Sequence, residues 1–280
     1  MPPDFTSHSA FAETDPALGL IRLAALLAEA NLPPDWETVD MMSDQVGAGV
    51  LREADPRRLW PELSRALMGT APGRLLGILR ASCALADLLP EVFHLYGVPQ
   101  ISDAAVSVDL GEHLEASLTE AARVEAPLNV RFALLTLHVG KFDSPREHLP
   151  FHYKPLERGA PRVTEIAERF GVPDAAHDLA LTAMAEVERI HRATISRAGP
   201  LAQMLKRLGA FDAPARYEEL ILTAACDYRA HSGRSGEAYP KGALLDAARK
   251  ACLAVEPTDA ARAQAIARAF GSQRWTGGAA

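Results

Sequence analysis

The stretch Arg131-Phe132-Ala133-Leu134-Leu135-Thr136-Leu137-His138-Val139-Gly140-Lys141 is an apolar run that a glycine–lysine pair closes. Three apolar residues of this run share one helix face, at i, i+3 and i+7: Phe132, Leu135 and Val139. Gly140 interrupts the pattern, so we expect a buried helix from Pro127 to Gly140 with His138 in its last turn. A histidine there can be a metal ligand or an acid–base group, although a cap favoured by the helix dipole is the commoner explanation.

The remainder of the chain predicts an all-α protein. Strict alternation of polar and apolar residues is almost absent, and prolines repeatedly stand where apolar, helix-spaced segments begin. Such starts are found at Pro16, Pro56, Pro72, Pro173, Pro214 and Pro240. Between Ser144 and Pro161 the sequence is rich in proline, so we expect an irregular segment there, followed by a short helix from Val163 to Phe170.

Composition and charge limit the classes of partner. The 280-residue chain is 48% hydrophobic and 23% charged, which is ordinary for a globular protein with a large core. Its net charge of −7 argues against a protein that binds nucleic acid over its whole surface. The charge is uneven, because residues 241–280 carry six basic and three acidic side chains. This basic end can contact phosphate, or it can be an ordinary solvated helix face.

The cysteines and the hydropathy indicate the compartment. Three widely spaced cysteines form no CxxC pair, so we expect neither a zinc site nor a disulfide, and a reducing cytoplasm fits. No apolar run approaches the ~18 residues of a membrane span, so no membrane partner is expected. Residues 1–14 lack the basic and apolar parts of a secretory signal and are predicted to be a flexible leader.

The opening stretch resembles the central motif of HD-domain phosphohydrolases, in the form found in the C-terminal half of bacterial CCA-adding tRNA nucleotidyltransferases. That motif usually reads Arg-Phe-Ala, three residues, then His-Asp-Leu-Gly-Lys. Laid on this chain without a gap, the family His falls on Leu137 and the family Asp on His138, while Gly140 and Lys141 match. Four further segments between about residues 40 and 255 resemble the family in the same order: LWPELSRALMGTAPGRLLGILRASCALADLLPEV, RFGVPDAAHDLALTAMAEV, DAPARYEELILTAACDYR and SGRSGEAYPKGALLDAA.

The resemblance implies a domain plan. Residues 15–100 correspond to neck-like helices, 101–210 to a degenerate HD-type domain and 211–270 to a C-terminal helical extension, with a flexible tail at 271–280. The family's nucleotidyl-transfer head is mixed α/β and has a Gly-Ser turn and paired aspartates that hold Mg²⁺. The residues before the neck-like part contain neither feature, and nucleotidyl transfer needs clustered carboxylates. The resemblance therefore implies that this chain alone does not add CCA.

The family's metal ligands are only partly matched. The first family His is His113, the second His-Asp pair falls on Val187-Glu188, and Lys154 brings a positive charge into the cluster of later histidines. Leucine and valine cannot ligate a metal, and a nearby lysine raises the cost of binding one. The resemblance leaves as candidate metal residues His113, His138, His152, Glu188 and His191. We expect no cofactor; the alternative is one divalent transition metal on a rearranged ligand set.

The function implied by the resemblance is that of a non-catalytic or weakly active relative that binds tRNA or another RNA, or assists its processing. The candidate phosphate contacts are Arg229, Arg234, Lys241, Lys250 and Arg262. One alternative is a metal-dependent phosphohydrolase of the 2′,3′-cyclic phosphodiesterase type. Another is a protein-interaction module, which would bind a separate protein or a second copy of itself through the neck helices.

Overall fold

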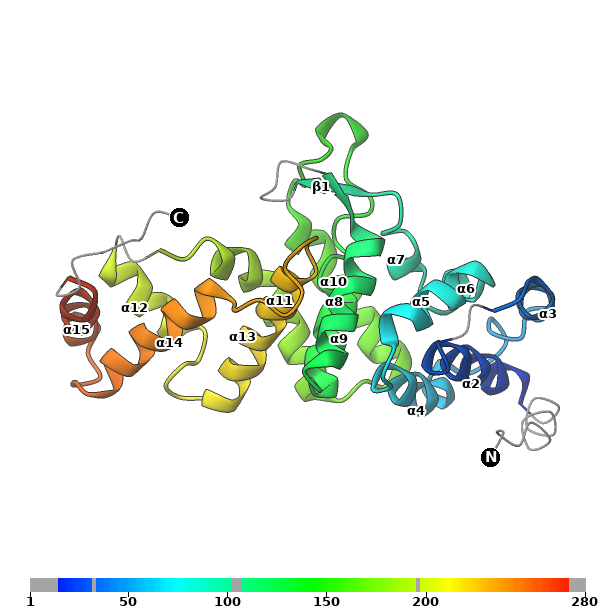
Figure 1. The fold of residues 1–280 in the computed structure, drawn as a ribbon, viewed down its shortest axis with the longest axis horizontal. Coiled ribbons are helices and arrows are strands. Elements are labelled where there is room, and N and C mark those ends of the chain that lie inside the picture. Colours follow the sequence, from blue (N-terminus) through cyan, green and yellow to red (C-terminus); the bar gives the residue numbers. More distant parts are fainter. Residues whose placement is uncertain (1–14, 32–33, 102–106, 195–196, 272–280) are drawn as a thin grey trace.

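The computed structural model describes residues 15–31, 34–101, 107–194 and 197–271, which form an elongated array of α-helices with one short β-hairpin (Figure 1). The predicted all-α class is confirmed. The predicted leader at 1–14 lies outside the described residues, as does the tail after residue 271. Within the described ranges, no helix combines the length and apolar character needed to cross a membrane.

The N-terminal group of helices begins at aspartate caps. The side chain of Asp15 accepts a hydrogen bond from the amide of Leu18, and Asp35 and Asp55 cap the following helices in the same way. Such caps satisfy amides that have no partner within the helix. The helices of this group are α2 (Pro16–Glu29), α3 (Trp36–Gly47), α4 (Pro56–Leu67), α5 (Pro72–Ala81), α6 (Ala84–Leu88) and α7 (Pro90–Phe93).

A β-hairpin that the sequence did not predict follows this group. Strands β1 (Pro99–Ile101) and β2 (Ser107–Asp109) pair antiparallel, and three residues each are too few to show an alternating pattern. Asp109 then caps the next helix by accepting hydrogen bonds from two of its first amides. The hairpin therefore lies at the start of the central helices, above the region where they meet (Figure 1).

Helix α9 (Leu128–Thr136) is the centre of the molecule. It packs against α8 (Leu110–Arg123), α11 (Asp174–His191) and α13 (Pro214–Arg229), so the whole of residues 130–136 is buried. The prediction that this helix reaches Gly140 was wrong, because residues 137–140 form turns closed by i to i+3 hydrogen bonds. His138 consequently lies in a turn beyond the helix rather than within the helix itself.

The irregular segment predicted between Ser144 and Pro161 is shorter than expected. A 3₁₀ turn spans Arg146–His148, and helix α10 (Pro155–Phe170) already begins at Pro155, with Pro161 inside it. A proline within a helix removes one hydrogen bond and crowds the preceding turn. The cost is offset by a buried apolar face, which consists of Gly159, Val163, Ile166, Ala167 and Phe170.

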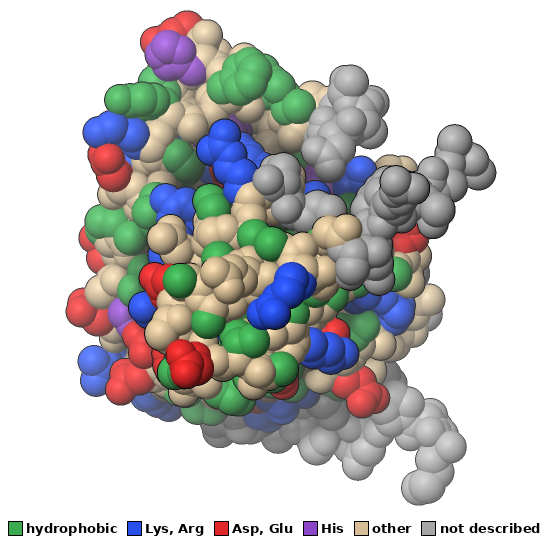
Figure 2. All heavy atoms as spheres, turned by 90° about the vertical axis from the view of Figure 1, so that its left-hand side faces the viewer, with side chains coloured by type: hydrophobic (Ala, Val, Ile, Leu, Met, Phe, Trp, Pro, Cys, Tyr) green, Lys and Arg blue, Asp and Glu red, His purple; other side chains and the backbone are tan. Residues whose placement is uncertain are grey.

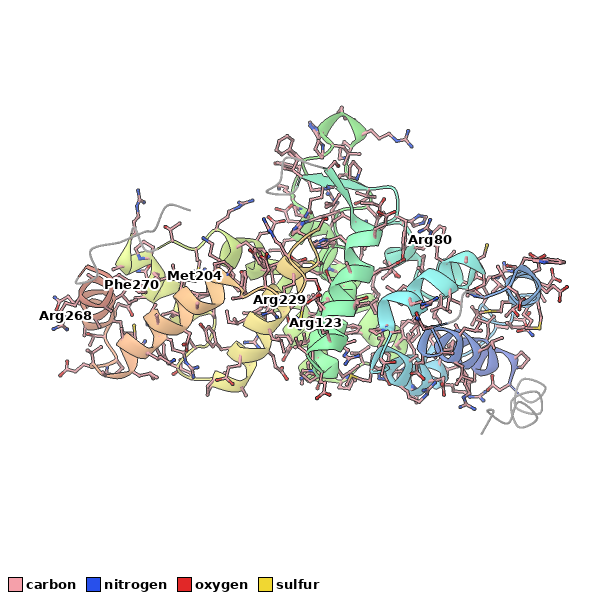
Figure 3. All side chains as sticks on the ribbon, viewed as in Figure 1. Arg80, Arg123, Met204, Arg229, Arg268 and Phe270 are labelled. Atoms are coloured by element: carbon pink, nitrogen blue, oxygen red, sulfur yellow. The ribbon has the colours of Figure 1, made fainter. Side chains whose placement is uncertain are left out.

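The C-terminal group packs at the far end of the molecule from α2 and α3. It consists of α12 (Ala198–Arg207), α14 (Pro240–Leu253) and α15 (Asp259–Gly271), which contact one another beside α13. Met204 of α12 and Phe270 of α15 are partly buried at this end (Figure 3). Of these helices, α14 begins at Pro240, where the sequence predicts a helix start.

Gly140 is required by a close approach between two segments. A Cβ atom at this position would lie 1.9 Å from the carbonyl oxygen of Pro155 and 2.9 Å from the amide nitrogen of Gly159. Only glycine therefore lets the turn after α9 rest against the first turn of α10. This contact fixes the position of the neighbouring Lys141, which is buried.

Arg131 joins the central helices to the N-terminal group. Its Nη1 atom donates hydrogen bonds to the carbonyl oxygens of Leu67 and Gly69, both at 2.8 Å, and its Nε atom donates to that of Ala126. Only 3% of the residue is exposed. Hydrogen bonds from a charged donor are among the strongest in proteins, so this side chain fixes the end of α4 against α9.

Candidate functional site

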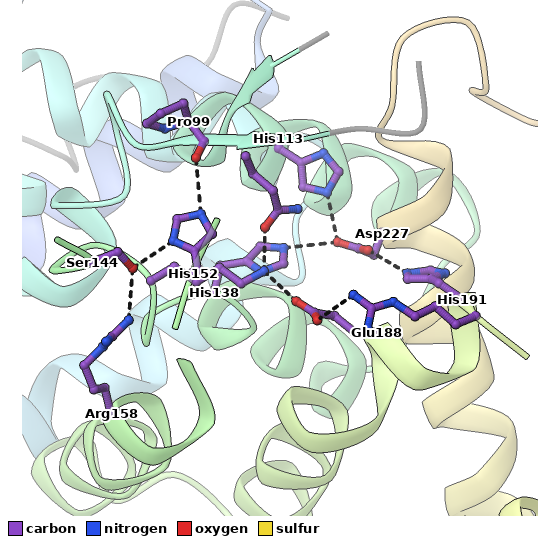
Figure 4. Close-up of polar contacts among 12 residues, drawn as sticks. Pro99, His113, His138, Ser144, His152, Arg158, Glu188, His191 and Asp227 are labelled. Carbon is purple, nitrogen blue, oxygen red and sulfur yellow. Dashed lines mark hydrogen bonds and ion pairs between the residues drawn. The ribbon is translucent and has the colours of Figure 1, made fainter. Parts of the chain in front are cut away.

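A cavity of about 680 Å³ opens where the hairpin, the α9–α10 connection and the ends of α11 and α13 meet. Its lining combines apolar with polar and charged residues, and Figure 4 shows the contacts among several of the polar ones. Its polar lining consists of Gln100, His138, Lys141, His152, Glu188, Arg189, His191, Arg192, Asp227, Tyr228, His231, Arg234, Tyr239 and Lys241.

Asp227 is the centre of the buried part of the site. Its Oδ1 atom accepts hydrogen bonds from Nε2 of His113 at 2.9 Å and from Nε2 of His138 at 3.3 Å, while Oδ2 accepts from Nε2 of His191 at 2.9 Å (Figure 4). Burial opposes ionisation of this carboxyl, but the charge and hydrogen bonds of the histidines hold its pKa well below the usual range. Asp227 is therefore a carboxylate, and each of the three imidazoles offers it an N–H.

The protonation of the histidines follows from these contacts. Nδ1 of His191 accepts from the hydroxyl of Tyr239 at 2.8 Å, which fits a neutral ring. Nδ1 of His138 is buried and has no hydrogen-bond partner among the residues that the structure describes. Burial and the nearby Lys141 ammonium lower the pKa of His138 to about 4, so this ring is neutral at physiological pH.

We expect acid to destabilise the fold through His138. Its pKa is 6.5 when unfolded and about 4 when folded, so the unfolded chain takes up the proton first. The stability that depends on a neutral His138 is complete above pH ~6.5 and is lost as the pH falls towards 4. We expect the free energy of unfolding to decrease by about 2 kcal/mol between pH 7 and pH 5. Urea unfolding with a chelator measures the loss, and His138→Gln should show a smaller pH dependence. Equal pH dependence in both proteins would contradict the assignment.

Lys141 is a buried residue that lines the cavity. Its Nζ atom donates to Oε1 of Glu188 at 3.0 Å and to the side-chain oxygen of Gln100 on β1. The Lys141 ammonium holds the pKa of Glu188 below its usual range. Arg192 adds a second, longer ion pair to the same carboxylate at 3.6 Å. The carboxylate of Glu188 is thus neutralised by basic side chains.

His152 belongs to a separate group at the edge of the cavity. Its Nδ1 atom contacts the hydroxyl of Ser144 at 2.8 Å, and its Nε2 atom donates to the carbonyl oxygen of Pro99 at 3.2 Å. Arg158 donates to the same hydroxyl at 2.9 Å. Burial and the nearby Lys141 ammonium lower the pKa of His152. This histidine links the 144–154 segment to the hairpin.

The buried cluster offers a ligand set for one transition metal. One atom each of His113, His138 and Asp227 lie within 4.8 Å of one another. Two imidazoles and a carboxylate suit a divalent first-row metal, once each ligating Nε2 has lost its proton. By contrast, Leu137 and Val187 provide no donor atom at the positions that resemble family ligands.

The structure brings together three of the five metal-ligand candidates that the sequence indicated and places the other two elsewhere. His113, His138 and His191 converge on Asp227, whereas Glu188 pairs with Lys141, and His152 bonds to Ser144. Asp227 itself was not among the candidates. Its signal in the sequence was a single acidic residue in the otherwise uncharged run LILTAAC-Asp-Tyr of α13.

The five predicted phosphate contacts are also divided. Arg234 and Lys241 line the cavity, and Lys241 donates to the carbonyl oxygen of Ala193 at 2.9 Å. Arg229 bonds to the carbonyl oxygen of Glu237 at the end of α13 (Figure 3). The other two lie away from the cavity: Lys250 pairs with Asp246, and Arg262 is buried over the ring of Phe211.

The cavity is positive although the chain is acidic. Five basic and two acidic residues line it, a net charge of +3 with the histidines neutral, against −7 for the whole chain. Figure 2 shows Lys and Arg side chains below the hydrophobic side chains at the top of the molecule. A concave surface lined by one sign of charge concentrates its field on a ligand of the opposite sign.

No protein-family model matches the chain. The multifunctional CCA protein of Cupriavidus necator is 39% identical over 264 residues, which cover 94% of this chain and 62% of that protein. The multifunctional CCA protein of Paracidovorax citrulli is 38% identical over 89% of this chain and 59% of its own length. That of Thioalkalivibrio sulfidiphilus is 36% identical over 94% and 64%. The chain is a homologue of the multifunctional CCA proteins and spans about 60% of their length.

Proposed function

We propose that this chain is an RNA-binding relative of the multifunctional CCA proteins, whose cavity binds phosphates of tRNA or another RNA without hydrolysing them. The observation that carries the proposal is the positive cavity described above, in a protein that is acidic overall. The phosphate backbone supplies most of the affinity of RNA for proteins, and lysine and arginine are its usual contacts.

Two basic residues are well placed for phosphate contact. Arg192 directly follows α11 with 80% of its side chain exposed, and Lys241, in the first turn of α14, lies beside it with its Nζ atom bonded to the carbonyl oxygen of Ala193. Arg234 lies near Lys241, with its guanidinium 4.5 Å from the centre of the Tyr228 ring. An RNA strand that enters the cavity would meet these three basic groups in its lining.

We propose that the cavity does not hydrolyse RNA because of the residues that line it. Hydrolysis of a phosphodiester in this class of site needs a metal that activates water and neutralises the phosphoryl oxygens. Glu188, the one carboxylate at the positions that resemble the family's second pair, is bound by Lys141. This ion pair occupies the carboxylate that a metal would need, while the exposed guanidinium of Arg192 offers a positive charge to a phosphate, which favours binding over bond cleavage.

A mobility-shift titration with tRNA at several salt concentrations tests the proposal. Binding should weaken steeply as salt rises, and changing both Arg192 and Lys241 to Gln should lower the salt slope by about 0.7–1 for each phosphate that the variant no longer neutralises. Lys250→Gln is the matched control, because Lys250 lies on the same helix as Lys241 but outside the cavity. An equal decrease in the control would contradict binding at the cavity, and no shift even at low salt would favour a protein partner.

The cluster of His113, His138 and Asp227 favours a second candidate function, a metal-dependent phosphohydrolase with a rearranged ligand set. Elemental analysis after purification without chelator separates the two. The RNA-binding proposal predicts well under one metal ion per chain and no hydrolysis of 2′,3′-cyclic nucleotides. About one ion per chain that Asp227→Asn releases and Glu188→Gln retains, with hydrolytic activity, would establish the second candidate instead.

A further inference from the structure

Exposed apolar side chains form part of the cavity lining. Phe151 is 70% exposed, Ile101 45% and Leu156 38%, and all three line the cavity. Tyr153, which is 66% exposed, follows two residues after Phe151. We call these four residues, two aromatic and two aliphatic, the aromatic rim. Large exposed hydrophobic side chains need an explanation when they are contiguous, because single ones are ordinary.

The rim is held in place by buried contacts beneath it. His152 lies between the two exposed aromatic residues and points the other way, to Ser144 and the carbonyl oxygen of Pro99. The amide of Phe151 donates to the carbonyl oxygen of His148 at 2.8 Å. Phe151 and Tyr153 therefore flank a residue that is hydrogen-bonded beneath them, and their own side chains are exposed to solvent.

The neighbouring charges indicate the ligand. The ammonium of Lys154 lies 5.6 Å from the centre of the Tyr153 ring and pairs with Glu157 at 2.9 Å, while Lys141 and Arg192 line the cavity together with Phe151. A surface that combines aromatic faces with basic groups suits single-stranded nucleic acid, because bases stack on the rings while phosphates meet the cations. A purely apolar protein partner would gain nothing from the adjacent positive charge.

We propose that the aromatic rim stacks an unpaired base of RNA, so that the cavity selects single-stranded ends or loops over duplex. This rests on the proposed function, because the phosphates of the same strand lie on the basic residues. Phe151 is the principal stacking residue and Tyr153 the second. In a duplex the bases are already stacked and paired, so the rim contributes little to its binding.

The test measures binding of RNA with an unpaired overhang that carries 2-aminopurine, against a blunt duplex of the same sequence. Phe151→Ala should bind the overhang about 5-fold or more weakly, lose the fluorescence change of the base, and keep the salt slope. Phe151→Trp should retain binding. Trp36→Ala is the matched control, because Trp36 is 71% exposed on α3, outside the cavity.

The outcomes separate the rim from the cavity. Failure of the wild-type protein to bind any RNA overturns both this inference and the proposed function. If RNA binds and the salt slope depends on Arg192 and Lys241, but Phe151→Ala behaves like Trp36→Ala, the rim inference alone is overturned. Equal affinity of the wild-type protein for overhang and blunt duplex also overturns it. Melting temperatures of the exposed-site variants check that each is folded.

Discussion

Replacing Gly140 with alanine is expected to destabilise the protein by about 3 kcal/mol or more, because a backbone must move to admit the methyl group. The new Cβ would meet the carbonyl oxygen of Pro155 at 1.9 Å, and the start of α10 cannot retreat without disturbing the packing of Gly159 against Met184. Chemical denaturation of the two proteins measures the difference in the free energy of unfolding.

Gly199→Ala is the matched control. Gly199 lies in the first turn of α12 with nothing within 4 Å of the added Cβ, so alanine should be neutral or slightly stabilising there. If Gly140→Ala were as stable as this control, the close approach between the turn after α9 and α10 would be wrong.

Replacing Arg131 with methionine is expected to cost about 3–5 kcal/mol, because three carbonyl oxygens lose a charged donor in a buried place. Methionine fills similar space but cannot donate to the oxygens of Leu67, Gly69 and Ala126. Thermal and denaturant unfolding should both report the decrease in stability, together with earlier proteolysis in α4 as its packing against α9 weakens.

Arg123→Met provides the comparison for this substitution. Arg123 pairs with Glu120 on the same helix and has 45% of its side chain exposed, so its replacement should cost at most ~1 kcal/mol. Similar decreases in stability in the two variants would show that the hydrogen bonds of Arg131 contribute no more than a surface ion pair.

The stretch from Arg131 to Lys141 predicts the packing of the helices better than it predicts the chemistry of the cavity. Its arginine and glycine match the resembled motif, and in the structure both make structural contacts. Its lysine also matches, yet Lys141 lies in the cavity, where it neutralises Glu188. The positions that resemble the metal pair, Leu137 and His138, are the ones that differ. Similarity of packing residues preserves a fold while the donor atoms in its cavity change.

The helices could be predicted because their signals are local, whereas the site depends on distant contacts. An aspartate cap followed by proline specifies the start of α2 or α4 within a few residues. The bond between His113 and Asp227 joins residues 114 positions apart, and no local pattern specifies it. The same limit explains Arg262, whose charge indicated phosphate binding but whose side chain lies over Phe211.

The start of α10 and the hairpin were missed for physical reasons as well. The prolines at 155 and 161 favoured an irregular segment, but the first can begin a helix and burial of the α10 face stabilises the second within it. The strands β1 and β2 are held by their pairing and by the hydrogen bonds of Gln100 and Pro99 at the cavity. Tertiary contacts of this kind override local preferences.

Photo-crosslinking of RNA that contains 4-thiouridine, followed by mass spectrometry of the crosslinked peptides, tests most directly that RNA binds at the cavity. We predict crosslinks in the segments around the cavity mouth, at residues 148–156, 189–192 and 228–241. These crosslinks should disappear when unlabelled tRNA competes and when Arg192 and Lys241 are both changed to Gln. Crosslinks confined to α2–α6 or to α15, with none in the cavity segments, would contradict the proposed site.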